Sequence, residues 1–144
     1  MSDGFNLERF VTAQAPGMAA ALGELKAGAK RTHWMWFVFP QLAALGRSSM
    51  AKFYGVASMA EAQAYLAHPV LGPRLIQATE AALAAPAASL GALFGSPDDL
   101  KFVSSMTLFA HAAGGDGGVF RQALARWNGG REDAVTVELL GASG

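Results

Sequence analysis

The chain has 144 residues, no cysteine, and equal numbers of basic and acidic side chains, so that its formal net charge is zero. This length suits one domain with its own hydrophobic core. The lack of cysteine excludes disulfides, thiolate metal sites and a cysteine nucleophile, and the neutral charge argues against a general nucleic-acid-binding protein, which carries a basic excess.

Hydrophobic residues make up 52% of the chain and charged residues 15%. Much of the apolar content is alanine, which favours helices, and no uninterrupted apolar run reaches the roughly eighteen residues of a transmembrane helix. The first four residues also lack the basic start and apolar core of a signal peptide. We therefore expect a cytoplasmic protein that does not associate with membranes.

The three histidines, His33, His68 and His111, are too far apart in sequence to form a short metal-binding motif. A metal site would need ligands from distant segments. We therefore predict no metal site and no other cofactor.

The first predicted helix is capped by Asn6 and carries an apolar stripe with helical spacing. The stripe consists of Leu7, Phe10, Val11 and Gln14. Because a buried amide needs hydrogen-bond partners, Gln14 is either a core amide or a ligand contact. Pro16 predicts the start of a second helix, and Gly28 predicts its end.

Residues 30–41, which we call the aromatic segment, have the sequence Lys-Arg-Thr-His-Trp-Met-Trp-Phe-Val-Phe-Pro-Gln. A strand would place apolar side chains on both faces, and a helix would place Trp36 well away from Trp34. In either conformation the aromatic side chains cannot all point to one side. The segment is therefore either buried all round or presents one aromatic side chain to a pocket.

The polar residues of the aromatic segment allow two interpretations. Lys30 and Arg31 could bind a phosphate or carboxylate group, and His33 could act as a general acid or base. Alternatively, the two cations form a solvated turn and the histidine is structural or exposed, which is the more common situation for such residues.

Short helices are predicted after the aromatic segment. The polar loop of residues 46–49 could cradle a phosphate, although it lacks the glycine spacing and the lysine of a P-loop. Ser58 and Glu61 form a capping box for a helix that stops before His68. In the next helix, Gly72 indicates an irregular first turn or close packing. Arg74 is a lone charge among apolar residues, and it either reaches solvent or meets a carboxylate or a ligand.

A strong helix start follows at residues 96–99, with a hydroxyl cap at Ser96, a proline and two acids. In this helix Lys101 and Ser104 share one stripe, at a spacing that would let a desolvated lysine activate a serine, although serines on exposed helix faces are more common. A glycine-rich loop, residues 114–118, leads to a helix that ends at residues 128–130, and Asp133 can start a last short helix. We find no internal repeat and no strand pairing.

Residues 30–42 resemble the signature of the bacterial and fungal family called domain of unknown function 1810. The resemblance covers nearly the whole chain and includes residues 7–14, 65–75, 94–95, 104–109 and 136–140, together with Asp99 and Lys101. It implies a compact, mostly helical single domain with no settled biochemical role. Ala29 stands where such sequences often carry an arginine, which removes one anion contact. The pair Ala43-Ala44 stands where a glycine is common, which indicates a more helical turn after Pro40.

The sequence therefore predicts an all-α fold. We expect one domain over residues 1–144, with an ordered core over residues 5–141, in which seven or eight helices form a compact bundle around the aromatic segment.

The first functional hypothesis is a small-molecule binding protein for an anionic ligand such as a nucleotide or an ADP-ribose-like metabolite, with hydrolysis as an extension. Cations lie near tryptophans that could stack on a base, and a weak analogy to helical ADP-ribose-processing domains suggests the ligand class. The candidate ligand-binding residues are Gln14, Lys30, Arg31, His33, Trp34, Trp36, Gln41, Arg74, Lys101 and Ser104. No catalytic pair or triad is evident, and Asp99 and Glu61 are the only acids that we nominate as a general base.

The second hypothesis is a non-catalytic protein-interaction module whose aromatic segment is purely structural. The low charge content fits a protein that buries part of its surface in a homodimer. Burial separates the two hypotheses. Complete enclosure of Trp34, Trp36 and His33 with internal partners favours the second. A cleft that His33, Lys30 and Arg31 line together with Gln14, Lys101 or Ser104 favours the first.

Overall fold

The computed structural model describes the backbone of residues 4–143. These residues form nine α-helices and one 3₁₀ helix, and their one β pairing is an isolated bridge between Leu42 and Val56. The elements are α1 (Glu8–Ala27), α2 (Met35–Val38), η1 (Ala43–Leu45), α3 (Ser49–Phe53), α4 (Met59–Ala67), α5 (Leu71–Leu83), α6 (Leu90–Phe94), α7 (Asp98–Ala113), α8 (Gly118–Asn128) and α9 (Ala134–Ser143). The all-α prediction is confirmed. The helix count exceeds the predicted seven or eight because helices as short as α2 show no helical period in sequence.

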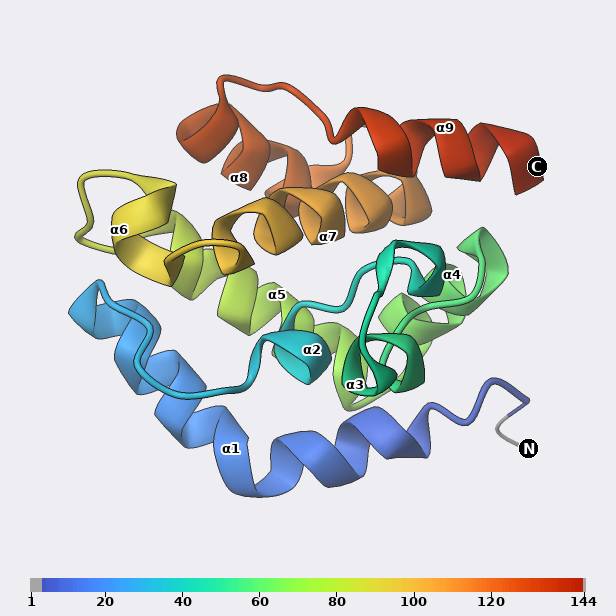
Figure 1. Ribbon diagram of the computed structural model, residues 1–144, viewed down its shortest axis with the longest axis horizontal. Helices are drawn as coiled ribbons and strands as arrows, with labels where there is room; N and C mark the ends of the chain where they lie inside the picture. The colour runs from blue at the N-terminus through green and yellow to red at the C-terminus, as the bar shows by residue number, and fades with distance from the viewer. Residues whose placement is uncertain (1–3, 144) are drawn as a thin grey trace.

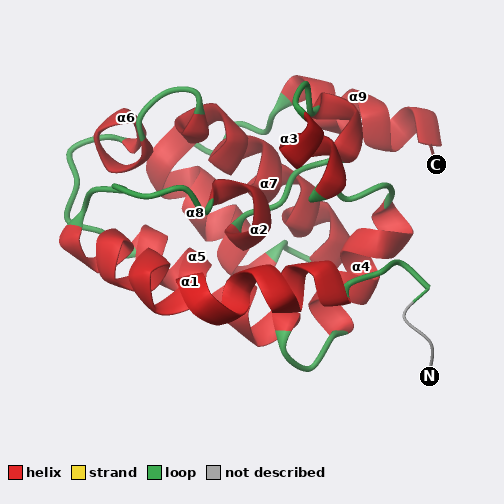
Figure 2. Cartoon of the chain, turned by 60° about the horizontal axis from the view of Figure 1, so that its bottom comes forward, coloured by secondary structure: helices red, strands yellow, loops and turns green. Residues whose placement is uncertain are grey.

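Helix α7 lies at the centre of the bundle and contacts α4, α6, α8 and α9. Figure 1 shows it crossing the middle of the molecule, with α8 and α9 on one side and α5 and α1 on the other. All residues from Phe102 to Ala110 are buried, as expected for a helix that is covered on every side. In Figure 2, helices and loops account for the described chain, and α2 lies between α1 and α7. No helix among the described residues is long and apolar enough to cross a membrane.

Helix α1 corrects two predictions about the N-terminal region. It is one helix of 20 residues that continues through Pro16, and its N-cap is Leu7 without a side-chain hydrogen bond. Both halves of α1 bury residues against the core, namely Phe10, Gln14, Ala21 and Leu25, so that tertiary packing outweighs the hydrogen bond that the proline removes. Figure 1 shows a bend near the middle of α1. The predicted end at Gly28 is confirmed, because this residue adopts the left-handed conformation with φ 83°.

Side-chain caps start several helices. The Ser58 hydroxyl accepts a hydrogen bond from the Glu61 N–H, which confirms the predicted cap at Ser58. The Glu61 carboxylate accepts from the Ala57 N–H, one residue before the N–H that a capping box uses. Asp133 caps α9 by accepting from the Thr136 N–H and hydroxyl. The predicted hydroxyl cap of α7 is wrong. Backbone carbonyls of Gly95 and Pro97 accept from the first N–H groups of α7, so these donors are taken without Ser96.

The aromatic segment packs into the core through its apolar residues. Trp34, Met35, Val38 and Phe39 are almost wholly buried. The Phe39 ring lies 5.0 Å from the Phe102 ring and 5.9 Å from the Phe94 ring, both edge-on, and the Phe94 and Phe102 rings stack at 4.8 Å. These contacts join the aromatic segment to α6 and α7.

Glu24 near the end of α1 holds the start of the aromatic segment. Its carboxylate accepts hydrogen bonds from the backbone N–H groups of Arg31 (2.7 Å) and Thr32 (3.0 Å), the Thr32 hydroxyl (2.6 Å) and the Trp34 indole N–H (2.9 Å). Burial by itself would raise the pKa of Glu24, but these hydrogen bonds to the charged form outweigh it and lower the pKa to about 2. The indole N–H of a buried tryptophan thus has its partner inside the fold.

We expect Glu24→Gln to lower the free energy of unfolding at pH 7 by about 1.5–3 kcal/mol, the range for hydrogen bonds to a charged group. The pKa of about 2 in the folded protein lies below the ordinary value of 4.5. The stabilisation by Glu24 is therefore complete above that ordinary value and is lost as the pH falls toward 2. Urea denaturation of both proteins at pH 7 and pH 3 measures this difference, which should shrink at pH 3. A difference that is the same at both pH values would contradict the role of the charge.

A second prediction concerns the tight junction between α4 and α5. A Cβ atom on Gly72 would lie 2.2 Å from the Leu66 carbonyl oxygen, which supports close packing as the reason for this glycine. We expect Gly72→Ala to lower the free energy of unfolding by about 1–3 kcal/mol. The control is Gly23→Ala in α1, where an added Cβ meets nothing within 4 Å. This substitution should stabilise the protein by about 0.4–1 kcal/mol. Equal effects of the two substitutions would refute the steric explanation.

Candidate functional site

A cleft of about 460 Å³ lies between the η1–α3 region and the first turns of α7, with the start of α9 at its edge. Its lining residues are Gln41, Leu45, Gly46, Arg47, Ser48, Ala51, Pro97, Leu100, Lys101, Ser104, Asp133 and Val135. We call it the Lys101 cleft. A narrow pocket of about 10 Å³, enough for about one water molecule, shares Gln41, Ala51 and Lys101 with it and is also lined by Met35, Trp36, Phe39 and Tyr54.

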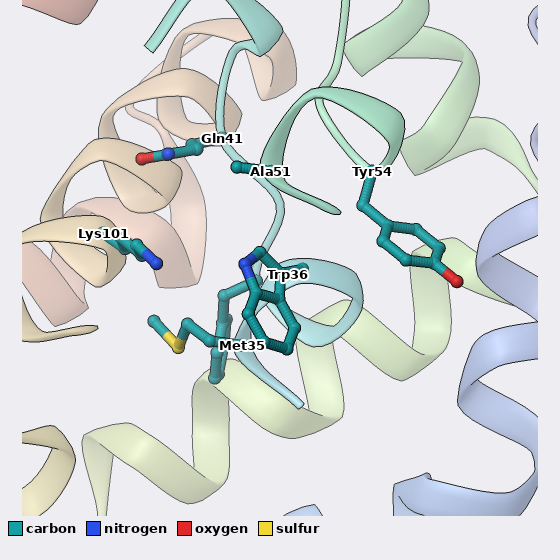
Figure 3. A pocket seen from close by; sticks show the side chains of 7 residues that line it. Met35, Trp36, Gln41, Ala51, Tyr54 and Lys101 are labelled. Carbon is teal, nitrogen blue, oxygen red and sulfur yellow. The ribbon is translucent and has the colours of Figure 1, made fainter. Parts of the chain in front are cut away.

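Lys101 stands at the boundary between the cleft and the narrow pocket. Its ammonium lies 5.7 Å from the centre of the Trp36 ring, a cation–π distance, and 3.7 Å from an Asp98 carboxylate oxygen. Because 3.7 Å exceeds hydrogen-bond length, Asp98 does not take up the Lys101 N–H groups. Figure 3 shows the Lys101 and Trp36 side chains extending toward each other, while Gln41 reaches from the end of the aromatic segment toward the helix that carries Lys101. This ammonium can therefore donate to an anion in the cleft.

Ser104 follows Lys101 by one turn and lines the same cleft. Its hydroxyl donates to the Leu100 carbonyl at 3.2 Å, which leaves its lone pairs as acceptors. This geometry is that of a helix-face serine and does not show the lysine-activated nucleophile that the spacing allowed. Ser104 can contribute a hydrogen bond to a ligand, but its proton is directed away from Lys101.

The loop between η1 and α3 supplies the other polar residues of the cleft. Arg47 is exposed, and the Ser48 hydroxyl caps α3 by accepting from the Ala51 N–H at 3.1 Å. The Gln41 side chain faces both the cleft and the narrow pocket, while its backbone carbonyl accepts from the Val56 N–H. Sequence reasoning considered this loop as a phosphate cradle but left Arg47 out of the candidate residues, because no P-loop pattern singles it out.

Gln14 lies elsewhere, inside the helical core, and the half-buried Arg74 lies beside it. The Gln14 amide nitrogen donates to the Phe37 carbonyl at 2.6 Å and to the Tyr65 hydroxyl at 3.0 Å, and its oxygen lies 3.5 Å from the Arg74 guanidinium. Burial raises the pKa of Tyr65 well above its usual value. Gln14 therefore has the partners of a core amide, and neither it nor Arg74 lines a cavity described above.

The N-terminal half of the aromatic segment is divided between core and surface. Trp34 is enclosed by the core and bound to Glu24. Lys30 forms a 2.8 Å ion pair with Asp98 and lies 5.2 Å from the Trp34 ring centre. Arg31 and His33 are exposed and line neither the Lys101 cleft nor the narrow pocket. The structure thus brings together four of the ten candidates, namely Trp36, Gln41, Lys101 and Ser104.

The two acids nominated as general bases already have structural partners. Glu61 is buried and pairs with Arg9 at 2.9 Å, and Asp99 accepts from the Leu100 N–H. Among the described residues, no group of three or more histidine or acidic side chains could hold a metal ion. The arrangement places two cations, Lys101 and Arg47, at the cleft, with the Trp36 ring beside Lys101.

Comparison with known proteins gives two matches and one negative result. The crystal structure of the conserved hypothetical protein Rv1873 from Mycobacterium tuberculosis superposes with a TM-score of 0.93 and 52% sequence identity, over 96% of this chain and 99% of that one. No curated protein matches the sequence. The family described as "Protein of unknown function (DUF1810)" matches residues 4–140. This match confirms the resemblance that residues 30–42 indicate, and the chain belongs to the DUF1810 family.

Proposed function

We propose that this protein binds an anionic small molecule in the Lys101 cleft. The observation that supports this proposal best is the convergence of Trp36 and Gln41 from the aromatic segment with Lys101 and Ser104 from α7. These residues combine a cation, an amide, a hydroxyl and an aromatic ring. Largely apolar pockets with a few convergent polar groups are typical of small-molecule sites.

A nucleotide or an ADP-ribose-like metabolite is the ligand class that we favour. Its phosphates would meet Lys101 and Arg47, which are the cations of the cleft. Its base would find apolar surface in the cleft, including Leu45 and Leu100. Such a ligand agrees with the cytoplasmic location that the sequence predicts.

Binding has more support than hydrolysis. Two acids lie at the cleft or beside Lys101, and both already have partners: Asp98 forms ion pairs with Lys30 and Lys101, and Asp133 caps α9. A general base needs a carboxylate within hydrogen-bond reach of the attacking water. We therefore propose a binding protein first and keep catalysis as an extension.

A thermal-shift screen against nucleotides, ADP-ribose and phosphorylated metabolites tests the proposal. A ligand present at a hundred times its dissociation constant should stabilise the wild type by about 2.7 kcal/mol. Lys101→Met should lose most of this stabilisation because it removes the cation but keeps an unbranched side chain only one atom shorter. The matched control is Lys26→Met, which makes the same change of charge at an exposed position on α1 and should respond like the wild type.

Three outcomes would count against the proposal. A panel without any hit would remove the support for an anionic ligand, and an equal loss of response in both variants would indicate non-specific charge attraction. A hit that persists in Lys101→Met would place the ligand outside the Lys101 cleft.

A homodimer is the alternative that one specific observation favours. Leu100 and Val135 line the cleft although they are 65% and 50% exposed, and exposed apolar side chains often mark protein interfaces. In this case the wild type should sediment as a dimer at micromolar concentration and Leu100→Ser as a monomer. The control Ile76→Ser, on an exposed face of α5, should leave the dimer intact. A monomeric wild type in sedimentation velocity would exclude this alternative.

A further inference from the structure

We propose that Lys30 is a positioning residue for the Lys101 cleft: by pairing with Asp98, it leaves the Lys101 ammonium available to an anionic ligand. This inference rests on the proposed function, and it assigns to Lys30 a role other than ligand contact. It concerns three side chains, from the aromatic segment and from the first turn of α7, which we call the Lys30–Asp98–Lys101 triad.

The two ion pairs of the triad differ in length. The Lys30 ammonium lies 2.8 Å from one Asp98 oxygen, and the Lys101 ammonium lies 3.7 Å from the other. Only the shorter contact is within hydrogen-bond length. The Lys30 side chain is also the less exposed of the two lysines, at 8% against 27%. Asp98 is therefore bound mainly by Lys30, although Lys101 is its neighbour on the same helix.

The local fold holds Lys30 in this arrangement. Its backbone N–H donates to the Leu93 carbonyl at 2.7 Å, and its ammonium lies over the ring of Trp34, which is itself fixed by Glu24. Lys101 in contrast lies beside Trp36 and lines both the cleft and the narrow pocket. Each lysine thus has its own tryptophan, but only Lys101 faces the cavity.

The charge balance of the triad explains why Lys30 matters. Two ammonium groups share one carboxylate, so that the triad carries one net positive charge. Without the Lys30 charge, Asp98 would draw in Lys101, whose flexible side chain can shorten a 3.7 Å contact to a hydrogen bond. The triad would then be neutral and would no longer attract an anion. The Lys101 N–H groups would donate to Asp98 and would no longer be available to a ligand in the cleft.

Three variants separate this role from a structural one. In Lys30→Met, the affinity for an anion should fall about tenfold, the effect of roughly 1.4 kcal/mol from one unit charge at close range. In Asp98→Asn, it should rise by a similar factor, because both lysines keep their charge. The double variant Lys30→Met with Asp98→Asn should return to near the wild-type affinity, since Lys101 is again without a competing carboxylate. A purely structural role of Lys30 would not be rescued by removing its partner.

The first measurement is a titration with inorganic pyrophosphate, followed by NMR shifts of the Ser104 and Lys101 amides at fixed ionic strength. Lys26→Met serves as the control for general charge effects, and thermal unfolding without ligand checks that each variant is folded. The second measurement is a crystal structure of Lys30→Met without ligand, in which the Lys101 ammonium should lie within hydrogen-bond length of Asp98.

The two measurements distinguish the failure of this inference from that of the proposed function. If Lys101 stays apart from Asp98 in the Lys30→Met crystal, or if the double variant binds no better than Lys30→Met, the positioning role is wrong even when the wild type binds pyrophosphate. If pyrophosphate shifts no amide signal of a cleft residue in the wild type, the proposed function fails for phosphate ligands, and the role of Lys30 in binding fails with it. A Lys101–Asp98 hydrogen bond in the Lys30→Met crystal would then still confirm that Lys30 keeps these two side chains apart.

Discussion

The packing of Phe39 against Phe94 and Phe102 is the contact on which the rest of the structure depends. It joins the end of the aromatic segment to α6 and to the central helix α7. Buried aromatic pairs combine large apolar area with a preferred edge-on geometry, so this contact fixes both the position and the orientation of the segment. The chain that follows, from Gln41 through η1 and α3, is thereby placed opposite the first turns of α7, where the Lys101 cleft forms.

The aromatic segment serves the core and the cleft at the same time. Trp34 precedes α2 and turns inward to Glu24, whereas Trp36 lies on α2 and borders the narrow pocket. Met35 and Val38 of α2 are buried in the core. A helix of four residues has little stability of its own, so the burial of its neighbours is what holds Trp36 beside Lys101. Changes that loosen the core contacts of this segment should therefore also disturb the cleft.

Buried polar groups are satisfied inside the fold, and this decides which charges remain for a ligand. The Arg9 guanidinium donates to backbone carbonyls of Phe53 and Gly55 and to the Glu61 carboxylate. These hydrogen bonds make a partly buried charge tolerable. They also leave Arg9 and Glu61 with internal partners, so that neither is available to bind a ligand or to act as a general base. Among the described hydrogen bonds, none is donated by the Lys101 ammonium. Lys101 and the exposed Arg47 are the cations that the fold leaves at its cleft.

The sequence by itself determined the helical class, most helix boundaries and the importance of the aromatic segment. These features follow from local rules: hydrophobic period, capping residues such as Ser58 and Asp133, and glycine in the left-handed conformation at Gly28. Local rules failed at Pro16, because residues buried on both sides of this proline keep α1 continuous. They also failed at Ser96, because backbone carbonyls accept the hydrogen bonds that its hydroxyl was predicted to accept. Only the tertiary structure decided which candidate residues meet. Gln14 became a core amide and Lys101 a cleft residue because their surroundings come from segments distant in sequence, and no spacing along the chain encodes those contacts.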